Sequence, residues 1–317
     1  MLSWAGYYLR FHTDQAWTAP GFPGSMLRGA FGHALKRCVC AMRLRECTGC
    51  SLEYTCLYTS LFETRPPPDS KTMTRYTRAP HPFVLSTRLE QQNATDSTEK
   101  HELGRTLDCV MRLFGKARHA APFVLRAFEE AGKHGFGWDN TPFTLQAVCP
   151  ESAFHRQGQA AGGWQAGQPF PAPKIEPVPE PLPETVHLRF LTPLRLPRAG
   201  KLSTVENFDP ATFSMAVVRR VGLLATFFGD EGKAGLDFTA LKAESTKIRL
   251  VEKHLRWQKL FRYSSRQKAR QSVGGLVGSA GLDLAGAPGL RQVLAWAPVV
   301  HVGKGTSMGL GQVAVQS

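Results

Sequence analysis

The chain has 317 residues, of which 39 are Lys or Arg and 25 are Asp or Glu, so its formal net charge is +14 at pH 7. With 42% hydrophobic and 20% charged residues, the composition excludes a disordered or fibrous chain. The length favours two domains over one, because single cores divide beyond ~250–300 residues. The charge indicates an acidic partner, nucleic acid before an anionic membrane.

Membrane segments are not evident in the sequence. No run of ~18 apolar residues occurs, because Arg219 and Arg220 interrupt the most apolar stretch, residues 211–229. The first six residues lack the basic and apolar regions of a signal peptide. We therefore expect no membrane partner and a cytoplasmic protein with reduced cysteines, in which clustered thiols indicate metal ligands before disulfides.

Residues 1–150 predict a first domain. A strand is expected at 7–11, and Ser25 can cap a helix from Met26 to about Arg37. Further along, the pattern predicts a strand at 81–89, a helical region over 103–133 and a last strand at 144–148, after a turn at 135–138. A cysteine-rich insertion at 38–65 interrupts this domain.

The insertion holds four cysteines in the pattern C-x6-C-x2-C-x5-C, namely Cys40, Cys47, Cys50 and Cys56. Four thiolates suit a tetrahedral structural zinc ion, and an iron–sulfur cluster is the less favoured occupant. Two of the gaps are longer than in a usual zinc knuckle, so reduced cysteines without a metal are the alternative. The pattern suggests no open coordination position, so we expect no cofactor for catalysis.

Residues 151–184 predict a linker between two domains. Four glycines between positions 158 and 167 precede seven prolines between positions 169 and 183. Such a run favours a stiff, extended spacer. The alternative is a long ordered loop on the surface of a single domain, although structureless loops of this length are uncommon there.

Residues 185–317 predict a second domain. A strand at 186–191 precedes a helix that Asp209 can cap, with Pro210 in its first turn and an apolar stripe of Val217, Val221, Leu224 and Phe228. Strands at 247–251 and 257–263, a helix at 288–296, a strand at 299–302 and a closing strand at 311–316 complete it. The order predicts an α+β protein with two ferredoxin-like (βαββαβ, RRM-like) domains in tandem.

The glycine-rich segment 303–311, Gly-Lys-Gly-Thr-Ser-Met-Gly-Leu-Gly, follows the strand expected at 299–302. Glycines let backbone amides approach a phosphate, and Lys304 adds a positive charge. The spacing is not that of a Walker A loop, and too little chain follows for a dinucleotide-binding fold. A tight hairpin is the alternative, for which glycines would suffice.

Two basic segments also indicate nucleic acid. Residues 242–270 hold ten Lys or Arg against two Glu, with Trp257, Phe261 and Tyr263 interleaved. Cations neutralise phosphates and aromatic faces stack on unpaired bases, although a solvated sheet face with aromatics in the core is the alternative. Residues 28–45 hold five cations and no acid, with His33 close to Lys36 on the expected helix, where a partly buried histidine is the alternative.

These residues resemble a known family. A glycine-rich loop before the last strand of a ferredoxin-like domain is similar to the RAMP superfamily of CRISPR RNA-binding proteins. The segments 255–267, 274–278, 301–304 and 23–35, and the cysteine pattern that leads into 56–63, resemble the CRISPR endoribonucleases that process precursor RNA. The resemblance covers about 1–65 and 186–317. It implies repeat RNA (crRNA) and other CRISPR effector subunits as partners.

The resemblance implies metal-independent cleavage, in which a 2′-hydroxyl attacks the adjacent phosphate and leaves a cyclic phosphate and a 5′-hydroxyl. Related enzymes commonly use a histidine on the first helix, which points to His33, with His301 as competitor and Tyr263 and Lys36 as helpers. The residues expected to bind RNA are Arg28, Arg37, Lys259, Arg262, Arg266, Lys304, Gly303, Gly305, Thr306, Ser307, Gly309 and Gly311.

Two other functions fit the same sequence. A non-catalytic RAMP subunit that holds guide RNA would share the fold, the charge and the glycine-rich loop. A general zinc-stabilised nucleic-acid-binding protein would bind duplex DNA and unrelated RNA equally well. A metal-dependent nuclease fits poorly, because no Asp/Glu cluster at ligand spacing appears, and the acidic pair Glu129 and Glu130 lies on a helical pattern where a solvated face explains it.

Overall fold

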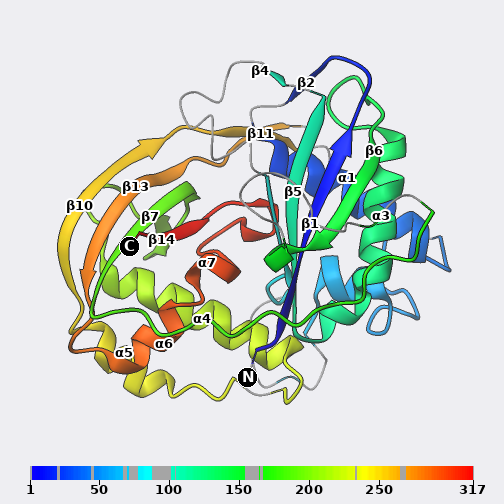
Figure 1. Cartoon of the computed structure of the whole chain (residues 1–317). Coiled ribbons are helices and arrows are strands. Elements are labelled where there is room, and N and C mark those ends of the chain that lie inside the picture. The colour runs from blue at the N-terminus through cyan, green and yellow to red at the C-terminus, as the bar shows by residue number, and fades with distance from the viewer. Residues whose placement is uncertain are drawn as a thin grey trace.

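Two four-stranded antiparallel sheets, one in each half of the chain, form the framework of this computed structural model (Figure 1). The structure describes residues 2–19, 22–43, 46–66, 70, 78–87, 101–103, 105–153, 164, 167–232, 234–264 and 269–316.

The first sheet has the strand order β3-β5-β1-β6. Its strands are β1 (Trp4–His12), β3 (Phe83–Thr87), β5 (Thr106–Phe114) and β6 (Thr144–Pro150). Helices α1 (Pro23–Val39) and α3 (Ala121–His134) pack together, and the apolar side chains of sheet and helices share one core. The order along the chain and in the sheet is that of a ferredoxin-like domain, which confirms the predicted plan for this half.

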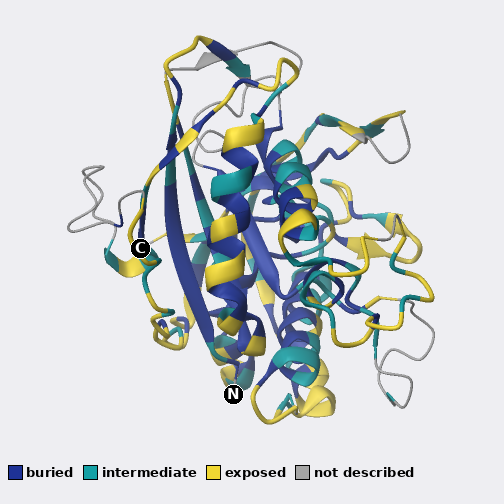
Figure 2. Cartoon of the chain, turned by 90° about the vertical axis from the view of Figure 1, so that its right-hand side faces the viewer, coloured by how far each residue is buried: buried dark blue, intermediate teal, exposed yellow. Residues whose placement is uncertain are grey.

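The second sheet has the matching order β10-β13-β7-β14. Its strands are β7 (Thr185–Leu194), β10 (Arg249–Gln258), β13 (Gly275–Asp283) and β14 (Val313–Gln316), and its helices include α4 (Pro210–Phe228) and α6 (Pro288–Leu294). Figure 2 shows how the helices turn their buried sides inward and leave exposed sides to solvent. The α+β tandem of two ferredoxin-like folds is thereby confirmed.

Shorter elements accompany the two sheets and their main helices. They are β2 (Trp17–Ala19), β4 (His101–Leu103), β8 (Pro197–Arg198), β9 (Lys201–Leu202), β11 (Phe261–Ser264), β12 (Ala269–Ser272), α5 (Phe238–Ser245), α7 (Ala297–Val300), a π-helical turn η1 (Thr59–Glu63) and the 3-10 turns η2 (Gly115–Ala120), η3 (Glu151–Ala153) and η4 (Thr306–Met308). Of these, the β11–β12 hairpin and η4 matter most for function, because both contact the first half of the chain.

Helix α4 forms as its sequence predicts. The Asp209 carboxylate accepts hydrogen bonds from the amides of Ala211 and Thr212, at 3.2 and 3.1 Å, and so caps the helix. The apolar stripe that includes Val217 and Leu224 is buried in the second core. By length and composition α4 passes for a membrane span, yet half of it is buried inside the molecule, so the core accounts for its apolar character.

Several local predictions were wrong. Helix α1 begins at Pro23, with Phe22 at its N-cap position and no side-chain cap, so Ser25 does not cap it. Residues 106–114 form strand β5 rather than a helix, because their apolar side chains alternate and only residues 121–134 carry the helical pattern. Residues 297–300 form the short helix α7 rather than a strand, because Pro298 lies in its first turn. The long strand β13 was not predicted, since it is glycine-rich and largely buried and therefore lacks polar alternation.

The proline-rich part of the linker runs extended along the surface, as its composition predicts, from about residue 168 to β7 (Figure 1). It is hydrogen-bonded to both halves: the amide of Glu176 donates to the Trp4 carbonyl at 3.0 Å, and the amide of Leu182 donates to the Arg291 carbonyl at 3.1 Å. At its start the Trp164 ring stacks on Phe170, with centroids 4.7 Å apart. These contacts hold the extended segment against the folded halves.

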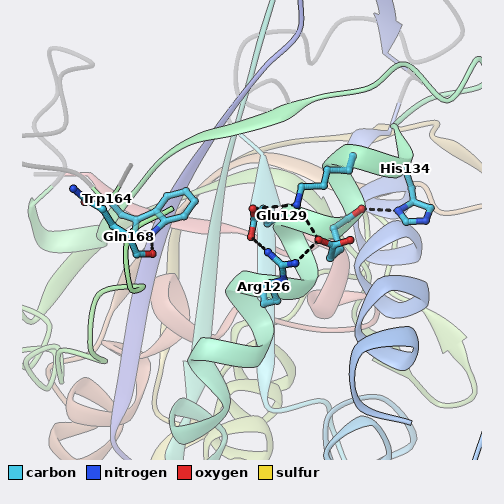
Figure 3. A network of polar contacts seen from close by, with 7 residues as sticks. Arg126, Glu129, His134, Trp164 and Gln168 are labelled. Atoms are coloured by element: carbon cyan, nitrogen blue, oxygen red, sulfur yellow. Dashed lines mark hydrogen bonds and ion pairs between the residues drawn. The ribbon is translucent and has the colours of Figure 1, made fainter. Parts of the chain in front are cut away.

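The acidic pair on α3 is part of a surface ion-pair network, as Figure 3 shows beside Trp164 and Gln168. Arg126 and Lys133 each pair with Glu129 and Glu130 at helical spacings of three and four, with distances from 2.6 to 3.2 Å. Such pairs stabilise a helix on its solvent side. The two carboxylates are thus paired with cations on a partly exposed face of the helix.

Candidate nucleic-acid interface

The glycine-rich loop joins α7 to β14 and requires its glycines. Gly303, Gly305, Gly309 and Gly311 all have positive φ angles, of 88°, 85°, 96° and 67°. A Cβ at Gly311 would lie 1.8 Å from the Val302 carbonyl oxygen, and one at Gly303 would lie 2.6 Å from the Arg195 carbonyl oxygen. Only glycine fits so close to backbone in this conformation.

Most amides of the loop donate to protein carbonyls rather than pointing outward. Those of Lys304, Met308, Gly309, Leu310 and Gly311 all do so, at 3.0 to 3.3 Å. These five amides are therefore not available to a phosphate in this conformation. Thr306 and Ser307 are buried, whereas the Lys304 side chain is exposed. The loop thus acts first as a rigid connection and offers its charge through Lys304.

The loop also contacts the first half of the chain, through Arg28 on α1. The Arg28 Nε donates to Ser307 Oγ at 3.0 Å, and its guanidinium lies 5.1 Å from the centroid of the Phe62 ring. A second guanidinium nitrogen, Nη2, lies 3.0 Å from His81 Nε2. Burial and the nearby Arg262 lower the pKa of Arg28. This residue was predicted as an RNA contact, and it also fastens the two halves together.

His81 is a site residue that the sequence did not reveal. Its Nδ1 lies 3.1 Å from the Leu61 carbonyl oxygen, which can only accept, so Nδ1 carries the proton and Nε2 accepts from Arg28. Burial, followed by the charge of Arg28, lowers the pKa of His81 to about 3. A neutral imidazole therefore orients the Arg28 guanidinium. A lone histidine before a strand gave no pattern by which to find it.

Arg262 and Arg195 join Arg28 in one cluster of arginines at the junction of the halves. Arg262 Nη2 donates to Gln271 Oε1 at 2.6 Å and Nη1 reaches Ser25 Oγ at 3.5 Å. Arg195 Nη1 donates to the Ser272 and Gly274 carbonyls at 3.0 and 3.2 Å. Burial, and then the charge of Arg262, lowers the pKa of Arg195.

The described part of the chain supplies no carboxylate ion pair to Arg28, Arg195 or Arg262. The buried Arg262 Nε also has no hydrogen-bond partner among the residues that the structure describes. Arg262 lies close enough to Arg28 and to Arg195 that its charge opposes theirs, which is unfavourable in the absence of an anion. We call these residues the arginine cluster; its charge suits a phosphate backbone.

Helix α1, whose first turns meet this cluster, also carries the expected catalytic histidine. His33 is exposed, as is Arg37, and the Lys36 ammonium lies 5.5 Å from the centroid of the Tyr58 ring. His33 follows Ser25 by eight residues, or about 12 Å along the helix axis. A Cβ at Gly29, between them, would meet no atom within 4 Å. The open surface of α1 therefore leads from the cluster to His33.

His301 lies in a different environment. It is fully buried, with an exposed fraction of 0%. Burial, followed by the charges of Arg112 and Arg220, lowers the pKa of His301 well below its usual value. These two arginines are fixed by hydrogen bonds to the carbonyls of residues 298–300. A histidine enclosed in this way does not reach a bound substrate.

The remaining predicted residues lie on or near the β11–β12 hairpin. Lys259 precedes it and is exposed, and Tyr263 lies on β11 with half of its surface exposed. The Tyr263 ring contacts that of Trp138, which the sequence analysis did not single out as a site residue. Arg266 lies outside the described residues.

The four clustered cysteines approach one another without forming a metal site. Cys40, Cys47, Cys50 and Cys56 line a single cavity of about 20 Å³. Within the described ranges, however, no group of three or more His, Cys, Asp or Glu side chains is arranged to hold a metal ion. The predicted zinc site is therefore not supported. All four cysteines are free, and burial raises the pKa of the Cys47 thiol.

Two ferredoxin-like halves contact each other at a glycine-rich loop, and arginines gather at this junction. This arrangement defines a protein of the RAMP type. Residues 2–168 match the family model AF_1859_N, described as an N-terminal domain, and residues 188–313 match the model of the CRISPR-associated endoribonuclease Cas6. The first model covers more than half of the chain, so the chain belongs to the AF_1859_N family, and its second half carries a Cas6 endoribonuclease domain. No curated protein matches the sequence.

Solved structures share the whole fold at low identity. The Cas6 (TTHB231) product complex has a TM-score of 0.59 and 18% identity over 99% of both chains. A structure of Thermus thermophilus Cas6 (TTHB231) has a TM-score of 0.54 and 18% identity over 100% of this chain and 99% of that one. The Cas6 (TTHA0078) product complex has a TM-score of 0.54 and 16% identity over 100% of both chains. A partial Cas6-RT-Cas1–Cas2 complex has a TM-score of 0.56 and 12% identity over 100% of this chain and 46% of that one.

Proposed function

We propose that this protein binds CRISPR repeat RNA and cuts precursor crRNA within the repeat. The observation that carries this function is the arginine cluster, which meets the first turns of α1, the helix that also carries the exposed His33. Its guanidinium groups can neutralise phosphates on both sides of a cut. The Cas6 match of residues 188–313 supports the same substrate class. The activity would belong to the cytoplasm, where crRNA passes to CRISPR effector subunits.

The proposed reaction needs no metal ion. A 2′-hydroxyl of the RNA attacks the adjacent phosphorus, the bond to the 5′-oxygen of the next nucleotide breaks, and the products are a 2′,3′-cyclic phosphate and a 5′-hydroxyl. The step transfers one proton from the attacking oxygen and one to the leaving oxygen, and it adds negative charge to the phosphorane. A histidine and nearby cations are sufficient for these tasks.

His33 is the residue that we propose for the proton transfer at the attacking or leaving oxygen. It is exposed on α1, the helix that also carries Lys36 and Arg28 and whose Ser25 is reached by Arg262. Those cations would stabilise the phosphorane. The buried His301 contributes to folding instead. The other exposed cations, Arg37, Lys259 and Lys304, would hold the flanking phosphates, together with Arg266.

The decisive experiment is cleavage of the repeat RNA from the neighbouring array in EDTA, beside a copy with one 2′-deoxynucleotide at the cut. We expect cleavage of the first RNA and binding without cleavage of the second. His33→Ala should remove cleavage and keep binding, whereas His134→Ala, at an exposed histidine at the end of α3, should change neither.

Two results would contradict this function. If the repeat RNA is bound tightly but never cut, the protein is a guide-holding subunit. If duplex DNA and unrelated RNA bind as well as the repeat, it is a general nucleic-acid-binding protein. Cleavage of the 2′-deoxy copy would rule out the attack by the 2′-hydroxyl while leaving the endonuclease activity in place.

A further inference from the structure

Two exposed aromatic rings from different halves of the chain contact each other beside the arginine cluster. The rings of Trp138 and Tyr263 have centroids 5.9 Å apart and planes inclined at 55°. Trp138 is nonetheless 65% exposed and Tyr263 is 49% exposed. A contact whose purpose was to hold the halves together would bury both rings, because burial of apolar surface is what stabilises such a contact.

The position of Trp138 is fixed by the turn that carries it, residues 135–140. Gly135 has a φ of 94°, and a Cβ there would lie 2.0 Å from the Asn140 carbonyl oxygen. Phe136 and Thr141 exchange backbone hydrogen bonds of 2.9 and 3.0 Å across the turn. The amide of Gly137 lies 3.0 Å from the Met26 sulfur, which ties the turn to the first turns of α1. The indole is thus presented on a rigid support.

The position of Tyr263 is fixed by the β11–β12 hairpin. Tyr263 pairs with Arg270 across the hairpin. At the hairpin's base, Leu260 and Val273 are buried in a small apolar cluster with Phe22 and Leu310. That cluster connects the hairpin with the start of α1 and with the glycine-rich loop. Both rings are therefore anchored to the same end of α1.

Arginines lie next to Tyr263 on both strands of the hairpin, Arg262 along the chain and Arg270 across from it. Arg262 precedes Tyr263 in β11 and reaches Ser25 on α1. The Arg270 guanidinium lies 4.3 Å from the centroid of the Phe261 ring, on the paired strand. Asp139 is the one acidic residue in the turn 135–140. Exposed aromatic faces with cations beside them are the features that bind unpaired nucleotides, because bases stack on the rings while phosphates meet the charges.

We propose that Trp138 and Tyr263 form a stacking platform for one unpaired base of the RNA, next to the site of cleavage. This inference rests on the proposed function and names the part of the substrate that lies beyond any base-paired stem. A base within a duplex cannot use the platform, since its faces are covered by its neighbours. The platform thereby selects RNA in which an unpaired nucleotide flanks the cut, and Tyr263 serves through its ring rather than its hydroxyl.

The test measures the affinity of two repeat RNAs, each with a 2′-deoxynucleotide at the mapped cut so that it stays intact. One RNA keeps the unpaired nucleotides on both sides of the stem, and the other has the flanking base nearest the cut replaced by an abasic unit. We expect Trp138→Ala and Tyr263→Ala to weaken binding of the intact flank by about 5- to 150-fold, the range for loss of one base stack. Binding of the abasic RNA should not change.

Conservative variants separate stacking from other roles. Trp138→Phe and Tyr263→Phe keep an aromatic face, so both should retain most of the affinity for the intact flank. Phe123→Ala is a matched control, since Phe123 is 53% exposed and lines a cavity with Cys38 and Val39, at the opposite end of α1. It should leave both affinities unchanged.

Several outcomes would overturn the platform while leaving the proposed function intact. The platform is wrong if Trp138→Ala binds the RNA with the intact flank as tightly as the native protein does. It is also wrong if the variant loses the same affinity for both RNAs, because that result indicates a general loss of structure or charge. If Tyr263→Phe binds normally but no longer cuts, Tyr263 acts through its hydroxyl in proton transfer. If the native protein fails to bind repeat RNA at all, the proposed function itself fails.

Discussion

Arg28, on the first helix, donates a hydrogen bond from Nε to Ser307 Oγ over a separation of 279 positions in the sequence, at 3.0 Å. The same guanidinium is held from the other side by His81 Nε2. One side chain therefore connects the helix of the first ferredoxin-like half with the glycine-rich loop of the second, at the edge of the arginine cluster.

This bond should contribute to the stability of the whole molecule. A hydrogen bond to a charged group is worth about 1.5–3 kcal/mol, and a partner left unsatisfied adds to the loss. We expect Arg28→Ala and Ser307→Ala each to lower the free energy of urea unfolding, with a coupling energy of about 0.5–3 kcal/mol in the double-mutant cycle. Additive effects would show that the two side chains do not interact in solution.

Elements with strong local signals were predicted well from the sequence. Asp209, Pro210 and the apolar stripe of α4 define a helix without help from distant residues, and the structure places its start and its buried face accordingly. The strand β5 was missed because its alternating residues run straight into the helical pattern of α3. Strand β13 was missed because burial on both faces removes the alternation on which the prediction depends.

The site was predictable by residue type but not by arrangement. Arg28 and Arg262 were found as cations, yet nothing local indicates that they approach each other or that Arg262 reaches Ser25 on the helix that carries His33. His81 and Trp138 lie outside both basic segments, and only the fold brings them to the cluster. The burial of His301 could not be predicted for a related reason, since burial depends on distant elements, here those of Arg112 and Arg220.

Catalysis should distinguish the two histidines sharply. We expect His33→Ala to reduce the single-turnover cleavage rate by about 10²- to 10⁴-fold, the usual contribution of a proton-transfer residue. His301→Gln should lower the melting temperature, because it disturbs a fully buried position, while the rate per folded molecule stays close to native. A large loss of rate in folded His301→Gln would return His301 to the catalytic role.

Close packing at Gly311 should make that position intolerant of any side chain. Gly311 and Gly235 both have positive φ, at 67° and 62°, so alanine is strained at either. A Cβ at Gly311 meets the Val302 carbonyl oxygen at 1.8 Å, whereas one at Gly235 meets nothing within 4 Å. Gly311→Ala should therefore lower the free energy of unfolding by about 2 kcal/mol or more, measured in thermal or urea unfolding. The effect of Gly235→Ala should be smaller. Equal effects would mean that the loop can move away.

Stability should fall in mild acid because of His81. Its pKa is about 3 in the folded protein against an ordinary value of 6.5, so between these values the unfolded chain binds a proton that the folded chain does not. The stabilisation is complete above pH 6.5 and is lost as the pH falls toward 3. Between pH 7 and pH 5 we expect a loss of about 1–2 kcal/mol from this residue. His81→Gln should flatten the pH profile of urea unfolding, and the exposed His134→Gln should not.

The arginine cluster should set the salt dependence of RNA binding. Each phosphate contact releases counterions, so the slope of log K against log salt falls by about 0.7–0.9 for each contact removed. Arg262→Gln keeps a polar side chain of moderate length and removes the charge, and we expect it to weaken binding and to reduce the slope by about that amount. Lys174→Gln, at an exposed position of the linker, is the control and should leave the slope unchanged. If Arg262→Gln binds more weakly but keeps the same slope, Arg262 does not contact phosphate. It would then act by holding the hairpin in place, through its hydrogen bonds to Gln271 and to Ser25 of α1.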